Sequence, residues 1–160
     1  MRSSQKKFAQ NNIHSGFTLI EILLVIAMLA ILAAVVIIAI NPAKQFGEAQ
    51  NAQRRSDVAS ILDAVHQYRL DNDGALPADG IQSASSCGTA VDDICRSGVS
   101  CVGINLDNLI ADEVYLRDIP NDPTAGNDDI TGYRIFQTDY GRVGVCAPNA
   151  YGGEEIGVVR

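Results

Sequence analysis

The chain has 160 residues, a formal charge of −7 at pH 7 and 47% hydrophobic residues. An apolar run near the N-terminus leaves about 120 residues, enough for one small domain and too few for two. Beyond residue 16 the one adjacent basic pair is Arg54-Arg55. Because phosphate binding needs clusters of Lys and Arg, this acidic composition argues against nucleic acid as a direct partner. The Arg54-Arg55 pair is expected on a solvated or intersubunit face.

The apolar run covers residues 17–40, and Glu21 is its single charged residue. At about 1.5 Å per residue, a helix of this length reaches about 36 Å, more than the ~30 Å hydrocarbon core of a bilayer. The segment before it carries Arg2, Lys6 and Lys7 and no acidic residue. The positive-inside rule therefore predicts a single-pass membrane protein with its N-terminus in the cytoplasm and the remainder outside.

A specific motif, Gly16-Phe17-Thr18-Leu19-Ile20-Glu21, joins the basic leader to this run. It resembles the class III signal peptide of type IV pilins and pseudopilins. The resemblance implies that a membrane-embedded prepilin peptidase removes a leader of residues 1–16 and that the new N-terminus at Phe17 is methylated. It also implies that Glu21 pairs, during assembly, with the free amino group of Phe17 on a neighbouring subunit.

Simpler interpretations of the same segment stay open. The apolar run is too long for an ordinary secretory signal peptide. An uncleaved signal anchor is the other alternative, and the combination of Gly16 with Glu21 weighs against it. A carboxylate inside a membrane segment costs at least a few kcal/mol, so it usually has a partner. Without one, Glu21 would snorkel to the interface or favour the positive end of the helix dipole.

Asn41-Pro42 interrupts the apolar run, because Pro disfavours helical geometry in the residue before it and lacks a backbone donor. Residues 41–72 then continue as a predicted amphipathic helix. Either the helix kinks here and continues, or it ends and a second helix starts. We favour one long helix over 17–71 with a kink at Pro42 and added local flexibility at Gly47. Its apolar face, which should pack on the globular head, comprises Val58, Ile61, Leu62, Val65 and Tyr68. The polar residues expected mostly off that face are Gln50, Gln53, Arg54, Asp57 and Asp63.

Residues 73–160 are predicted to form a globular head, so the fold class is α+β: a long N-terminal helix, transmembrane in its first half, packed on a small antiparallel sheet. The string from Tyr115 to Pro123 is again similar to pseudopilins and to many pilins, in which it leads into the antiparallel sheet. The elements expected in the head are an irregular loop over 79–103, a short helix over 106–116, a hairpin of strands 133–138 and 142–147, and a last strand over 156–159.

Four cysteines lie beyond the membrane segment: Cys87, Cys95, Cys101 and Cys146. The predicted topology places them in an oxidising compartment, and their even number indicates two disulfides with three possible pairings. We favour Cys87 with Cys95, which closes a local loop, and Cys101 with Cys146, which ties the middle of the head to a late strand. The alternative is a zinc site, which the lack of any Cys-x-x-Cys pair disfavours.

An Asp-rich loop offers a candidate calcium site. Its oxygen-bearing side chains, of the type that calcium binds, are Asp122, Asn127, Asp128 and Asp129. Major pseudopilins of type II secretion bind calcium in a loop of this region, so the resemblance implies the same here. The sequence departs from their pattern, since Thr124 stands where they usually carry an aromatic residue. The alternative is a loop of turn-forming residues without an ion.

No catalytic constellation is present: there is no Gly-x-Ser-x-Gly motif and no phosphate loop, and His66 is the only histidine beyond residue 16. We therefore expect no enzymatic activity and no cofactor other than calcium. The resemblance implies a structural subunit of a type IV pilus-like filament, a helical homopolymer built with prepilin peptidase and an inner-membrane assembly platform. It would leave the cytoplasmic membrane for an extracellular or periplasmic filament. The alternatives are a pseudopilin of a type II secretion or competence (DNA-uptake) system and a membrane-anchored binding module that never polymerises.

Overall fold

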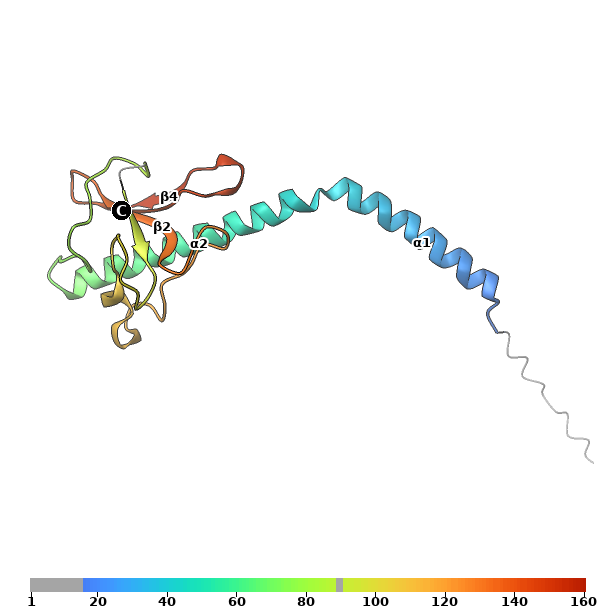
Figure 1. Cartoon of the computed structure of the whole chain (residues 1–160), viewed down its shortest axis with the longest axis horizontal. Helices are drawn as coiled ribbons and strands as arrows, with labels where there is room; N and C mark the ends of the chain where they lie inside the picture. The colour runs from blue at the N-terminus through green and yellow to red at the C-terminus, as the bar shows by residue number, and fades with distance from the viewer. Residues whose placement is uncertain (1–15, 89–90) are drawn as a thin grey trace, which may run out of the picture. The chain divides into compact units, whose positions relative to one another are not determined.

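The computed structural model describes residues 16–88 and 91–160, so the predicted leader, apart from Gly16, lies outside the described residues. The chain divides into two compact units that meet between Pro42 and Ala43 (Figure 1). The first contains helix α1, Leu19–Ile40, and the second, here called the head unit, contains α2 and the sheet. This helix-and-sheet arrangement confirms the predicted α+β fold class.

Helix α1 is apolar and exposed throughout its described length. Every side chain from Leu19 to Ile38 is exposed, and this 20-residue stretch is long and apolar enough to cross a membrane. Thr18 caps the helix, since its Oγ1 accepts a hydrogen bond from the Glu21 backbone N–H at 3.2 Å. An exposed helix surface of this composition needs lipid or other apolar helices around it.

The single long helix that the sequence predicts is instead two helices. Helix α2, Pro42–Asp71, follows α1 after Asn41 alone, and Asn41 adopts a left-handed conformation with φ 45° and ψ 80°. Asn tolerates this conformation better than most residues, and Pro is favoured at the first position of a helix because its missing N–H has no partner there. The position of the interruption was therefore predicted correctly, but the helix ends there and a second helix begins, whereas a kink was favoured.

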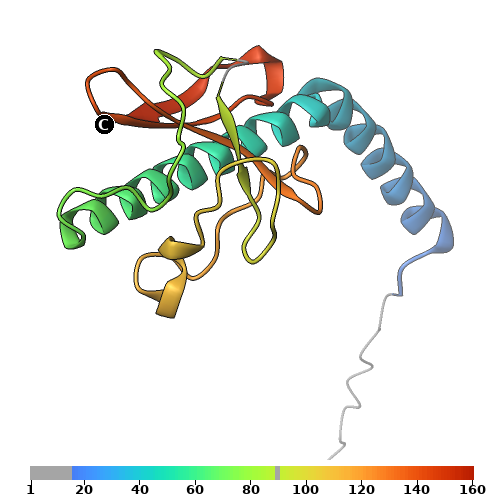
Figure 2. The same cartoon turned by 60° about the vertical axis from the view of Figure 1, so that its left-hand side comes forward.

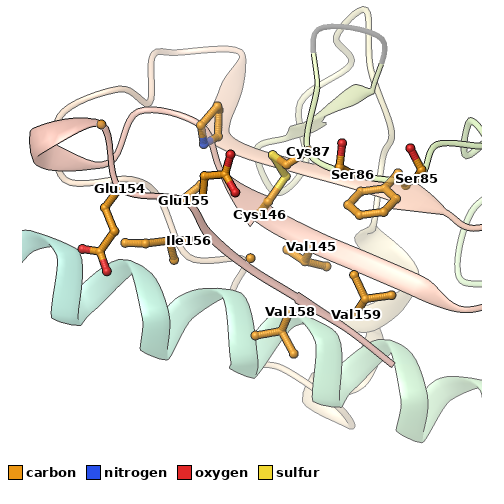
Figure 3. A pocket seen from close by; sticks show the side chains of 15 residues that line it. Ser85, Ser86, Cys87, Val145, Cys146, Glu154, Glu155, Ile156, Val158 and Val159 are labelled. Carbon is orange, nitrogen blue, oxygen red and sulfur yellow. A yellow bond between two sulfur atoms is a disulfide. The ribbon is translucent and has the colours of Figure 1, made fainter.

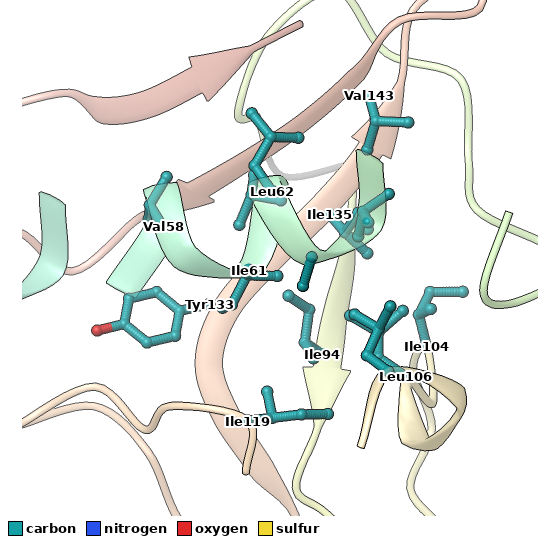
Figure 4. Close-up of a cluster of buried hydrophobic side chains, with 14 of the residues drawn as sticks. Val58, Ile61, Leu62, Ile94, Ile104, Leu106, Ile119, Tyr133, Ile135 and Val143 are labelled. Atoms are coloured by element: carbon teal, nitrogen blue, oxygen red, sulfur yellow. The ribbon is translucent and has the colours of Figure 1, made fainter. Parts of the chain in front are cut away.

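The apolar face of α2 packs on one face of the sheet, as predicted. Val58, Ile61, Leu62 and Val65 are fully buried there, and Tyr68 packs at the margin. Figure 4 shows these helix side chains meeting those of the strands. The sheet and loop residues of this core are Ile94, Ile104, Leu106, Leu109, Ile119, Tyr133, Ile135, Val143, Val145, Ala147 and Ile156.

The sheet has four antiparallel strands in the order β1-β2-β3-β4, and each pairs with its neighbour in sequence. The strands are β1 Asp92–Cys95, β2 Ile130–Gln137, β3 Val143–Ala147 and β4 Ile156–Val159. The register pairs Ile135 with Val145, and both side chains face α2. The hairpin and the last strand were predicted, whereas β1 lies inside the segment 79–103 that was expected to be an irregular loop.

The short helix predicted over 106–116 is wrong. The structure has two 3-10 turns, η1 Asp107–Leu109 and η2 Ala111–Glu113, and η2 is broken by residues of positive φ. The apolar residues that suggested a helix do not share one face: Leu109 is buried, whereas Val114 is 64% exposed.

The opposite face of the sheet carries a smaller apolar cluster of Val91, Phe136 and Cys146. Two disulfides join Cys87 to Cys146 and Cys95 to Cys101, so the favoured pairing is wrong although both cystines form. Cys146 lies on this far face, under the loop that carries Cys87. Cys101 pairs with Cys95 instead, because the chain after β1 folds back and forms an isolated β-bridge between Ile94 and Ile104.

Candidate functional site

The predicted processing site lies in extended backbone immediately before α1. Gly16, Phe17 and Thr18 are not helical, and the Phe17 side chain is 79% exposed. A Cβ added at Gly16 would meet no atom within 4 Å. In the described part of the chain, the Gly16–Phe17 peptide bond is therefore open to an approaching enzyme.

Glu21 occupies the first turn of α1 with an exposed side chain. Thr18 and Glu21 have the spacing of a capping box, and Thr18 supplies its half of it. Within residues 16–88 and 91–160, the Glu21 carboxylate itself has no hydrogen-bond or ion-pair partner. The first turn of α1 therefore presents an available negative charge a short distance from Phe17.

A second constellation, which we call the polar junction, ties α2 to the loops around the sheet. At its centre is Arg54, which is 1% exposed. Its Nε and Nη2 donate to the two carboxylate oxygens of Asp122 at 2.6 and 2.9 Å. Its Nη2 also donates to Thr124 Oγ1 at 2.6 Å, and its Nη1 donates to Asn51 Oδ1 at 3.0 Å. The expectation that Arg54 lies on a solvated or intersubunit face is therefore wrong: Arg54 is buried within the head unit, where its bidentate pairing with a carboxylate makes the burial tolerable.

The electrostatics of this pair favour the charged state of both groups. The hydrogen bond to Asp122 raises the pKa of Arg54 against the opposing effect of desolvation. Burial alone would raise the pKa of the Asp122 carboxyl, but the hydrogen bonds from Arg54 and from the N–H groups of Thr124 and Ala125 outweigh it. The pKa of Asp122 therefore lies below its usual value.

The junction continues one turn further along α2. Asp57, also expected off the packed face, is 6% exposed and accepts from the hydroxyl of Tyr133 at 2.7 Å and from Gln53 Nε2 at 2.7 Å. Burial and the neighbouring carboxylate raise the pKa of Tyr133 above its usual value. This contact fixes the middle of α2 to β2.

At its other end, the junction holds the loop between β3 and β4. Asn51 donates to Tyr151 O at 3.0 Å and to Glu154 Oε2 at 2.9 Å, and accepts from Tyr151 N at 2.8 Å. The Arg55 guanidinium also donates to Glu154, and this bond lowers the pKa of that carboxyl. Gly47 lets the Tyr151 ring approach the helix, since a Cβ at Gly47 would lie 2.3 Å from it.

The residues predicted to bind calcium are not gathered around a common point. Asp122 is held by Arg54, and Asn127 Oδ1 accepts from the backbone N–H groups of Asp129 and Ile130 at 2.8 and 2.9 Å. Asp128 and Asp129 are exposed. Within the described residues, no three His, Cys, Asp or Glu side chains could share a metal ion. Calcium binding here stays a prediction.

The junction was not found from the sequence, although a signal for it exists. Asn51 and Arg54 extend the three- and four-residue spacing of Val58, Ile61 and Val65. The pattern marks them as facing the sheet, and only their polarity argued otherwise. A polar residue in such a stripe is a candidate for a buried pair.

An exposed apolar helix capped by Thr18 and preceded by an open Gly-Phe bond defines a class of membrane-anchored, pilin-like subunits. The family description "prokaryotic N-terminal methylation motif" matches residues 11–39. This match covers the N-terminal segment, and together with two relatives of type II secretion it supports the likeness of the chain to the type IV pilin and pseudopilin family.

Two relatives are each described as type II secretion system core protein G. The protein from Pectobacterium carotovorum subsp. carotovorum is 36% identical over 78 residues, which cover 45% of this chain and 49% of the relative. The protein from Aeromonas hydrophila is 38% identical over 63 residues, which cover 39% of this chain and 43% of the relative. The chain thus spans about half the length of the curated relatives it matches or less. No solved structure matches.

Proposed function

We propose that this chain is a structural subunit of a type IV pilus-like filament, cleaved between Gly16 and Phe17 and assembled through α1. The observation that carries the proposal is α1 itself: an exposed stretch of 20 residues from Leu19 to Ile38 that is apolar except for Glu21, whose carboxylate lies in the first turn. An anchor that never leaves lipid has no use for a carboxylate at that depth, where it lowers the stability of insertion.

Processing and assembly then form one mechanism. Removal of the leader, a step assigned to prepilin peptidase, creates an amino group at Phe17. Glu21, four residues after Phe17 and in the first turn of α1, would pair with such an amino group on the next subunit. The apolar surface that leaves the lipid is buried again against neighbouring helices, at about 25 cal/mol per Å² removed from water. The subunit thereby passes from the cytoplasmic membrane to a filament outside it, with an inner-membrane platform as the assembling partner.

Substitution of Glu21 tests this function. In the native host, Glu21→Ala should abolish filaments in the sheared surface or periplasmic fraction while the subunit remains in the membrane fraction and is still cleaved. Asp139→Ala, which removes an exposed carboxylate of the head unit, is the matched control and should leave filaments intact. Normal filament yield from Glu21→Ala, or no filaments from the wild-type chain, would contradict the proposal.

A second candidate is a pseudopilin of a type II secretion system, which the descriptions of both relatives favour. Deletion of the gene distinguishes the two. A secretion pseudopilin is indicated if exported enzymes accumulate in the periplasm and the cell surface carries no fibres of this chain, whereas a pilin is indicated if surface fibres disappear and secretion continues.

A further inference from the structure

A cavity of about 430 Å³ opens on the face of the sheet that points away from α2. Its walls come from the loop around Cys87 and from strands β3 and β4. The Cys87–Cys146 disulfide and Val159 supply an apolar surface (Figure 3). The Phe136 side chain also lines the cavity. The volume lies within the range of about 300–1,000 Å³ that is typical of binding pockets.

One negative charge in this cavity has no partner. Figure 3 places the Glu155 carboxylate beside the Cys87–Cys146 disulfide. Its neighbour Glu154 is engaged by Asn51 and Arg55, whereas Glu155 forms no hydrogen bond or ion pair within the described ranges. The cavity thus combines an apolar wall with a free carboxylate, which fits a cationic group on an apolar stem.

The head unit carries such a group elsewhere. Val114 is 64% exposed, and Arg117 is exposed with no hydrogen-bond or ion-pair partner in the part of the chain that the structure describes. Between them, Tyr115 packs edge-on against Tyr68, with ring centroids 5.5 Å apart, and Leu116 packs against the core. The segment Val114–Arg117 is therefore held rigidly, with an apolar and a cationic side chain left outside.

The two features lie on opposite sides of the head unit. Figures 1 and 2 both draw the gold segment around η1 and η2 on the side of α2 that is opposite to the red strand β4. A contact between them in neighbouring copies would be heterologous, with each copy offering its cavity to one neighbour and its Val114–Arg117 segment to the next. Such contacts propagate into an open chain unless the rotation between copies closes a ring.

We propose that the cavity receives the Val114–Arg117 segment of a second copy of this chain, with the Arg117 guanidinium on the Glu155 carboxylate and Val114 on the apolar wall. The inference rests on the proposed function, since it assigns a contact between heads in the filament. Because a surface ion pair is weak, this contact would not drive assembly, which depends on α1. Its role would be to fix the register between neighbouring copies. Arg142, the other exposed arginine whose side chain has no hydrogen-bond or ion-pair partner among the described residues, lies immediately before β3 and outside the lining of the cavity.

Zero-length cross-linking of the full chain in membranes and in sheared filaments tests the contact. A carbodiimide joins carboxylates to amines and does not couple guanidinium, and the sequence has only three lysines, Lys6, Lys7 and Lys44. Arg117→Lys keeps the charge and supplies a reactive amine. It should yield covalent dimers joined between positions 117 and 155, identified by mass spectrometry, while the wild-type chain and the matched variant Arg142→Lys give none at position 155.

Adding Glu155→Gln to Arg117→Lys should abolish the cross-linked dimers, because a carbodiimide does not activate a carboxamide and the carboxylate that would react with Lys at position 117 is then absent. Salt at about 0.5 M should lower the dimer yield of Arg117→Lys alone, through screening. The inference is overturned if Arg117→Lys gives no dimers, if the dimers survive Glu155→Gln, or if they join position 117 to another carboxylate. Filaments without this cross-link overturn the head contact alone, whereas a cross-link in membranes without any filaments supports the contact and contradicts the proposed function.

Discussion

The Arg54–Asp122 pair offers the sharpest test of how the head unit is held together. Asp122→Asn keeps the size of the side chain and one acceptor oxygen but removes the charge. Arg54, 1% exposed, would then hold a buried positive charge with only neutral partners. Removal of one partner from a buried ion pair costs about 3–5 kcal/mol of unfolding free energy. For a unit of this size, such a loss lowers Tm by about 10–20 °C.

Near-ultraviolet circular dichroism of the full chain in detergent, with its disulfides intact, measures this change. The sequence has no Trp, and its five Tyr all lie beyond residue 43, so the signal reports the head unit and not α1. Asp139→Asn makes the same chemical change at an exposed position and should alter the unfolding free energy by no more than about 0.5 kcal/mol.

The double variant Arg54→Met with Asp122→Asn separates pairing from general disruption. Because neither charge is then left alone, the double substitution should cost less than the sum of the two single substitutions, by about 1–3 kcal/mol. The reasoning is refuted if Asp122→Asn costs less than about 1 kcal/mol, or if the two changes are additive.

Acid should lower the unfolding free energy of the wild-type head unit, because protonation of Asp122 breaks the same ion pair with Arg54. Since the pKa of Asp122 is lower in the folded state than its usual value of 3.8, the unfolded chain binds the proton first as pH falls. The stabilisation is complete well above pH 3.8 and declines as pH falls from there through the lowered pKa of the folded state. Stability measured between about pH 6 and pH 2 should fall less steeply in Asp122→Asn, and an unchanged slope would contradict the assignment.

Three further changes probe other contacts. Replacement of Gly by Ala within a helix normally raises the unfolding free energy by up to about 1 kcal/mol. Gly47→Ala should instead lower it by about 1–3 kcal/mol, because the added Cβ would enter the Tyr151 ring. In a chain that also carries Tyr151→Ala, denaturant unfolding should show that Gly47→Ala is stabilising. Replacement of both Cys87 and Cys146 by Ser should lower the unfolding free energy by about 4 kcal/mol, whereas replacement of both Cys95 and Cys101 should lower it by about 2 kcal/mol. The reason is that the two disulfides close loops of 59 and 6 residues, and equal losses would contradict it. Peptide mapping checks both pairings. Tyr133→Phe should cost about 1.5–3 kcal/mol. It should also lessen the loss of stability as pH rises above the usual tyrosine pKa of 10.0, where the unfolded chain ionises first, and an identical alkaline profile would contradict the raised pKa.

Hydrophobic periodicity predicted those parts of the fold in which burial follows apolarity. Val58, Ile61, Leu62 and Val65 repeat at helical spacing, and they form the face of α2 that packs on the sheet. Strand β4 was predicted with its observed bounds. Strand β1 could not be recognised because its sequence, Asp-Asp-Ile-Cys, has no alternation, and only its pairing with β2 makes it a strand.

The polar junction and the disulfides depend on tertiary placement. Arg54 and Asp122 are separated by 68 residues, and nothing local indicates that one neutralises the other. The pairing of Cys146 depends on which face of β3 it occupies and on which loop crosses that face. Sequence spacing favoured the nearer partner for Cys87, whereas the sheet brings Cys146 under it.

The polar junction has a mechanical consequence. Asn51, Arg54 and Asp57 lie on three successive turns of α2 and bind the β3–β4 loop, the loop after Asp122 and strand β2. A force applied at Pro42, where α2 begins, acts along the axis of α2. It therefore shears these three sets of hydrogen bonds at the same time. Attachments that share a load resist it together, whereas attachments that break in sequence fail one by one. Under such a pull, the head unit should therefore stay folded as one rigid body and should not unfold from its N-terminal end.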